Sequence, residues 1–151
     1  MFRYDVLCNH QLDRGFLSYA PLQDRGTQLI GWFLVAAGGA AGALTRYGIN
    51  LLMIRTIDSS LAGTFAANIS GSILLGFFIG FTQDRSNIPE EYRLLVAVGF
   101  LGSYTTFSTL TLVSTQLFEE GDILRASVNL FGSIFVGLLA ALVGLAIGRA
   151  L

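Results

Sequence analysis

Four long runs of apolar residues follow one another along the chain, separated by short polar stretches. The apolar runs extend over residues 29–54, 61–82, 94–118 and 123–148. Each run reaches the length of roughly 20 residues that a helix needs to cross a bilayer core of about 30 Å. The pattern therefore predicts four transmembrane helices, and an even number of spans places both ends of the chain on one side of the membrane.

The composition agrees with a membrane protein. Hydrophobic residues make up 53% of the 151 positions and charged residues only 13%, which lies outside the range of soluble globular domains. Four spans nearly exhaust this length, so we expect a polar N-terminal extension over residues 1–28 and one membrane domain over residues 29–151. The extension lacks the continuous apolar stretch of a cleavable signal peptide. The net charge of −1 offers no basic surface for nucleic acid.

Several kinds of chemistry are excluded by what the spans lack. Cys8 and His10 are the only cysteine and histidine, and both lie in the extension. Neither a Ser-His triad nor a cysteine or histidine metal site is therefore expected in the membrane, and we predict that the protein is not an enzyme. No Asp or Glu lies inside a predicted span. Because proton-coupled transporters usually carry the proton on a carboxylate at membrane depth, this favours a passive path.

The third apolar run contains an unusual segment, residues 99–109, with two glycines and six hydroxyl side chains. Gly99 and Gly102 each lower helix stability by about 1 kcal/mol, and the Ser and Thr hydroxyls compete for backbone hydrogen bonds. A break in the third helix is predicted. Lipid cannot satisfy such groups, so the segment indicates a pore or a substrate site. Freed carbonyls favour a cation and the N-terminus of the following half-helix favours an anion, so both ion types stay open.

Polar residues in the other spans allow a structural interpretation as well. Asn68 could hydrogen-bond to a neighbouring helix or donate to a passing anion, and the sequence alone favours neither. Asn129 and Ser133 are four residues apart and share one helix face, which is more typical of packing than of a pore. Arg46 and Arg125 are expected to anchor helix ends at the interface, and Arg125 can neutralise an acidic residue in the stretch 119–122.

The distribution of arginine gives a weak orientation signal. The side that holds both termini carries Arg3, Arg14, Arg25, Arg85, Arg93 and Arg149, and the opposite side carries Arg46, Arg55 and Arg125. The full chain therefore favours termini inside the cell. Within residues 29–151 the two sides are balanced, which would permit insertion in both orientations.

Taken together, these motifs resemble the Fluc/CrcB family of fluoride channels, and the likeness runs through all four spans. The stretch Gly99-Phe-Leu-Gly102-Ser-Tyr-Thr105-Thr-Phe107-Ser-Thr109 is similar to that family's long and specific signature Gly-x-x-Gly-x-x-Thr-Thr-Phe-Ser-Thr. The further matching stretches are Thr45-Arg46-Tyr47, Gly63-Thr64 with Asn68 and Gly71, and Val128-Asn129 with Ser133.

The resemblance implies an all-α membrane protein of four transmembrane helices with the third helix broken, assembled as an antiparallel dual-topology homodimer. Its implied function is a fluoride-selective channel in the inner or plasma membrane, through which cytoplasmic fluoride leaves down its gradient, so that fluoride toxicity is relieved. Its implied partners are a second copy of the chain, the fluoride ion and the lipid bilayer. The implied cofactor is a structural Na⁺ that is not transported.

Site residues carry over by position. The resemblance implies that the carbonyls of Gly102 and Thr105 hold the sodium ion, that Asn68 donates to fluoride, and that Phe107 presents the electropositive edge of its ring. The remaining candidates for the pore lining are Thr106, Ser108, Thr109 and Ser133. One position departs from the family, because Leu110 stands where a second Phe is usual. We expect conduction to persist through Phe107 and Asn68.

Two other functions fit a small four-helix membrane protein. One is a multidrug exporter with dual topology, which requires a membrane carboxylate in the first span that this chain lacks. The other is a structural membrane subunit without transport, which would leave the hydroxyl-rich segment of the third span unexplained.

Overall fold

The computed structural model describes residues 25–83, 85 and 88–151, and all regular structure in these residues is helical. Four helical runs are long and apolar enough to cross a membrane, namely Gln28–Ile57, Ser60–Thr82, Glu90–Glu119 and Ile123–Ala150. The predicted number and order of spans are confirmed. Cys8, His10 and residues 1–24 of the predicted extension lie outside the described residues.

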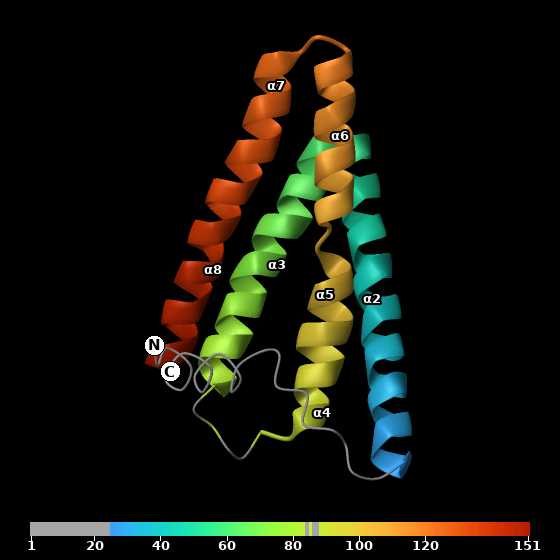
Figure 1. Ribbon diagram of the computed structural model, residues 1–151, viewed down its shortest axis with the longest axis vertical. Coiled ribbons are helices and arrows are strands. Elements are labelled where there is room, and N and C mark those ends of the chain that lie inside the picture. The colour runs from blue at the N-terminus through green and yellow to red at the C-terminus, as the bar shows by residue number, and fades with distance from the viewer. Residues whose placement is uncertain (1–24, 84, 86–87) are drawn as a thin grey trace, which may run out of the picture.

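The elements follow in a simple order. Helix α2 covers Arg25–Ile57 and α3 covers Ser60–Thr82. The third run consists of α4 (Glu90–Tyr92), the π-helical segment η1 (Arg93–Leu101), α5 (Gly102–Tyr104) and α6 (Phe107–Glu119). The fourth consists of α7 (Ile123–Ser127), the π-helical segment η2 (Val128–Gly132) and α8 (Ser133–Ala150). The runs lie side by side along one long axis (Figure 1).

Helix boundaries differ from the expected ones by a few residues. Helix α2 begins at Arg25 rather than at residue 29. The third run begins at Glu90, before the predicted start at residue 94. Pro89 precedes this start, and Glu90 and Glu91 stand in the first helical turn. Negative charge is favourable there because the helix dipole places partial positive charge at the N-terminus.

Glycines let neighbouring helices approach closely. A Cβ atom at Gly144 would overlap the carbonyl oxygen of Ile73, and one at Gly76 would overlap that of Ala141, so α3 and α8 touch backbone to backbone. A Cβ at Gly42 would likewise overlap the carbonyl oxygen of Phe100, which places α2 directly against η1. Such contacts are typical of helix packing in membranes.

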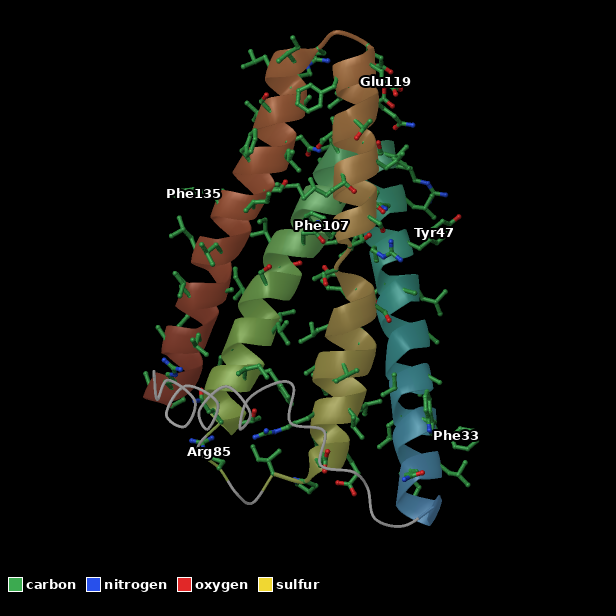
Figure 2. The ribbon with its side chains drawn as sticks, in the orientation of Figure 1. Phe33, Tyr47, Arg85, Phe107, Glu119 and Phe135 are labelled. Carbon is green, nitrogen blue, oxygen red and sulfur yellow. The ribbon has the colours of Figure 1, made fainter. Side chains whose placement is uncertain are left out.

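Large apolar side chains cover the outside of the bundle, whereas the buried core is small. Ala67, Leu101 and Tyr104 form a buried cluster, while Trp32 and Leu124 are about three-quarters exposed. Phe33, Tyr47 and Phe135 point away from the bundle (Figure 2). An outer surface this apolar suits lipid or a second subunit rather than water.

Two residues with extended backbone angles lie between α5 and α6, about midway along the bundle (Figure 1). Thr105 has φ −82° and ψ 153°, and Thr106 has φ −148° and ψ 114°. The amide of Thr105 still donates to the carbonyl of Leu101, at 3.1 Å. We call residues 105–106 the interruption, and it lies inside the hydroxyl-rich segment 99–109.

Candidate functional site

The side chain of Asn68 on α3 pairs with the backbone of the interruption. Its Oδ1 accepts a hydrogen bond from the Thr106 N–H at 2.7 Å, and its Nδ2 donates to the Thr106 carbonyl at 3.0 Å. Backbone groups that leave helical geometry at membrane depth need such partners. The structural interpretation of Asn68 is therefore confirmed. The amide NH2 carries two protons and this pairing uses one of them, so the residue can also donate elsewhere.

A cluster of hydroxyl groups caps the start of α6. The Thr106 Oγ1 accepts from the N–H of Thr109 at 3.3 Å and lies 3.1 Å from the hydroxyls of both Ser108 and Thr109. This is the usual role of a Thr at a helix N-cap. The 13-residue helix that begins at Phe107 directs its partial positive end toward the interruption.

A hollow of about 280 Å³ lies beside the interruption, between α3, α6 and the start of α8. Its wall consists of Asn68, Ser72, Leu75, Thr105, Thr106, Phe107, Leu110, Ser133, Ile134 and Gly137. The fold thus brings four of the predicted pore residues to one place: Asn68, Thr106, Phe107 and Ser133. Figure 2 shows Phe107 at the start of α6, beside α3. Ser108 and Thr109 do not line the hollow, although their hydroxyls lie 3.1 Å from the Thr106 Oγ1.

Three side chains of the wall differ in their surroundings. The Oγ of Ser133 is buried and has no hydrogen-bond partner among the described residues. Phe107 is 68% exposed, so one side of its ring lies open on this copy of the chain. Leu110, at the position where a second Phe was expected, is 4% exposed and part of the wall. A buried hydroxyl without a partner is costly unless a ligand or water meets it.

The predicted cation ligands are Gly102, the first residue of α5, and Thr105, the residue that directly follows α5. Both therefore precede α6 in the chain. In an α-helix the Thr106 N–H would bond to the Gly102 carbonyl, but here it donates to Asn68. Gly102 is exposed, and a Cβ there would meet only the carbonyl of Ala97, at 3.6 Å. Carbonyl oxygens at the C-terminal end of a helical segment carry partial negative charge, and oxygen ligands suit a hard cation.

In the part of the chain that the structure describes, no group of three or more His, Cys, Asp or Glu residues could hold a metal ion. The chemistry of the donors at the interruption, backbone carbonyls and neutral hydroxyls, fits Na⁺ better than a transition metal.

The other polar residues have mostly structural partners. Asn129 donates to Ser114 Oγ at 2.9 Å, which joins the fourth run to α6 and confirms packing for Asn129. Arg125 pairs with Asp122 at 3.4 Å, as expected. Arg46 lies about three turns before the end of α2, and its buried Nε has no partner among the described residues. Helix α2 continues to Ile57, and the anchoring of Arg46 at the interface stays a prediction.

Sequence reasoning missed two features near the interruption. Ser72 belongs to the wall of the hollow and stands four residues after Asn68, so helical spacing could have found it. Tyr104 bonds to Ser70 at 2.7 Å, a contact between residues 34 positions apart that no sequence motif indicates.

The family model described as "CrcB-like protein, Camphor Resistance (CrcB)" matches residues 33–145. A protein of Methylococcus capsulatus named "Fluoride-specific ion channel FluC" is 42% identical over 120 residues, which are 79% of this chain and 53% of that protein. Proteins of the same name from Maridesulfovibrio salexigens and Dehalococcoides mccartyi are each 38% identical, over 94% and 92% of their own lengths. The chain thus spans about half of the first relative and nearly all of the other two.

Proposed function

The chain belongs to the CrcB-like family, and from this premise we propose that it is a fluoride-selective ion channel of the cell membrane. Cytoplasmic fluoride would leave through it down its gradient, which relieves fluoride toxicity. The observation that carries the proposal is the hollow beside the interruption, where Asn68, Phe107 and Ser133 meet at mid-bundle depth.

The wall of the hollow suits a small, strongly hydrated anion. Fluoride gives up its water only where donors replace it, and the second amide proton of Asn68 and the unpartnered hydroxyl of Ser133 are such donors. The edge of the Phe107 ring adds partial positive charge, and the N-terminus of α6 adds more. No carboxylate is among the described residues of the wall, so no full negative charge there repels an anion.

The same wall argues against coupled export of drugs. A proton-coupled exporter needs an ionisable group at membrane depth, whereas the acidic residues of the described spans, such as Glu90 and Glu119, stand at the helix ends. The matched family and the relatives named above give the multidrug alternative no support.

We further propose that the interruption divides the third span into two half-helices and that the channel is an antiparallel homodimer. The exposure of the Phe107 ring and of Gly102 supports the homodimer, because both residues belong to the proposed site and both are exposed on a single copy of the chain. A second subunit would close the site from the open side. The balanced distribution of arginine within residues 29–151 is compatible with opposite orientations of the two copies.

Sodium is the cation that we propose for the carbonyls of Gly102 and Thr105. These oxygens lie where the helical hydrogen-bond pattern stops, since the Thr106 amide bonds to Asn68 instead. Na⁺ bound there would supply a fixed positive charge near the anion path. The chain contributes the oxygen ligands and keeps them beside the hollow through the Asn68 contact.

The function is tested by fluoride efflux from liposomes that contain the purified full chain. We expect release of fluoride, recorded with a fluoride electrode, and little release of chloride from vesicles loaded in the same way. Release no faster than from protein-free vesicles would contradict the proposal.

A further inference from the structure

A buried tyrosine is bonded to α3 immediately before the interruption. The hydroxyl of Tyr104 lies 2.7 Å from Ser70 Oγ. Tyr104 is 4% exposed, and its ring stacks on Phe100 with centroids 5.8 Å apart and planes 13° apart. Neither Tyr104 nor Ser70 belongs to the wall of the hollow, so neither contacts an ion in it.

The direction of this hydrogen bond follows from counting protons. The Ser70 hydroxyl has a single proton and lies 2.6 Å from the carbonyl of Ala66, to which it donates. Tyr104 must therefore be the donor and Ser70 Oγ the acceptor. A Tyr hydroxyl buried in an apolar core needs such a partner, because an unsatisfied buried donor is costly.

Three consecutive residues of the third run are held by one short stretch of α3. The backbone of Thr106 pairs with Asn68, and the hydroxyl of Tyr104 bonds to Ser70. The methyl group of Thr105 lies so close to Gly71 that a Cβ at Gly71 would overlap it. Of the two extended residues, Thr105 keeps a helical backbone hydrogen bond to Leu101 and Thr106 does not, so the contacts with α3 help to fix their position.

We propose that Ser70 and Tyr104 are positioning residues for the ion site. Their hydrogen bond fixes the end of α5 against α3, so that the backbone of the interruption stays aligned with Asn68 and the ring of Phe107 stays in the wall of the hollow. This role rests on the proposed function, since the site that the pair serves is the proposed fluoride path.

The first test measures position directly and needs no transport. Tyr104→Phe removes only the hydroxyl and keeps the stacked ring, so we expect amide hydrogen exchange at Thr105 and Thr106 to become about fivefold faster, the effect of one lost hydrogen bond. Exchange within α8 should be unchanged. Tyr92→Phe is the matched control, because Tyr92 is 56% exposed near the start of the third run.

The second test measures fluoride flux per folded channel in liposomes. Tyr104→Phe and Ser70→Ala should each lower the flux by about fivefold, and the double variant should lower it no further, because both single changes remove the same bond. Tyr92→Phe should leave the flux at the wild-type value. If Tyr104→Phe does not fold, Ser70→Ala alone carries both measurements, since it keeps the buried tyrosine.

Each outcome decides one question. Exchange at Thr105 and Thr106 that is unchanged in both single variants, or flux losses that add in the double variant, would overturn the positioning role. Absence of fluoride flux in the wild-type protein would refute the proposed function instead, and the exchange measurement would still show whether the pair holds the interruption.

Discussion

The sharpest test of the anion path replaces the amide of Asn68 by a carboxylate of the same shape. Asn68→Asp keeps an oxygen that can accept from the Thr106 N–H, now 2.7 Å away, and loses the Nδ2 donor to the Thr106 carbonyl. The lost hydrogen bond costs about 1 kcal/mol. The new negative charge acts on fluoride directly and is the larger effect.

Coulomb's law sets the size of that effect. For two unit charges about 4 Å apart at an effective dielectric constant of about 20, the repulsion is about 4 kcal/mol. Because each 1.4 kcal/mol corresponds to about a factor of ten, fluoride flux should fall by about a thousandfold. The flux is measured at alkaline pH, so that the carboxyl is ionised, and is divided by the amount of folded channel in the vesicles.

Two further variants separate charge from structure. Asn68→Leu removes both hydrogen bonds without adding charge, so its flux should lie between those of the wild type and Asn68→Asp. Asn129→Asp is the matched control, because Asn129 bonds to Ser114 and lies outside the wall of the hollow. Equal flux for Asn68→Asp and the wild type would remove Asn68 from the path. An equally large loss of fluoride flux in Asn129→Asp would show that the added charge acts by disturbing the fold and not by repelling fluoride in the hollow.

Three other changes test the packing, the departure from the family and the cation. Gly71→Ala should destabilise the protein by about 1–3 kcal/mol in denaturant unfolding, because its methyl group overlaps Thr105. Gly48→Ala is the control and should leave the stability unchanged, because nothing lies within 4 Å of a Cβ there. Equal stabilities of the two variants would contradict the close contact. Leu110→Phe should raise the flux per folded channel by adding a second ring edge beside Phe107, and an unchanged flux would make the position irrelevant. Replacing Na⁺ by a large organic cation throughout purification and assay should reduce flux or dimer yield, and indifference to the replacement would count against a sodium site.

The four spans could be predicted from the sequence because an apolar run of membrane length allows one structure only. The position of the interruption could not be predicted from the apolar pattern. Gly99 and Gly102 drew attention to the start of the segment, yet the extended residues are Thr105 and Thr106. Gly99 is needed for contact with α2, where a Cβ would come within 2.9 Å of the Val35 carbonyl.

The partner that holds the interruption is distant in sequence, which is why local propensity does not locate it. Asn68 lies 38 residues before Thr106, and only the packing of α3 against the third run brings them together. The π-helical segments η1 and η2 also lack a sequence signal, although η2 contains Asn129 and ends next to Ser133. The resemblance pointed to four of the ten residues of the wall, Asn68, Thr106, Phe107 and Ser133, whereas the geometry showed that Ser108 and Thr109 stand outside it.

Opposite ends of two helical segments meet at the interruption, and this explains how one place can suit ions of both signs without an ionised side chain. The carbonyls that end α5 carry partial negative charge, and the N–H groups that begin α6 carry partial positive charge. The Asn68 amide keeps the two ends apart by pairing with the residue between them. Weakening the Asn68 contact should therefore impair cation dependence and fluoride flux together, because Thr105 and Thr106 join the two helix ends that present these groups.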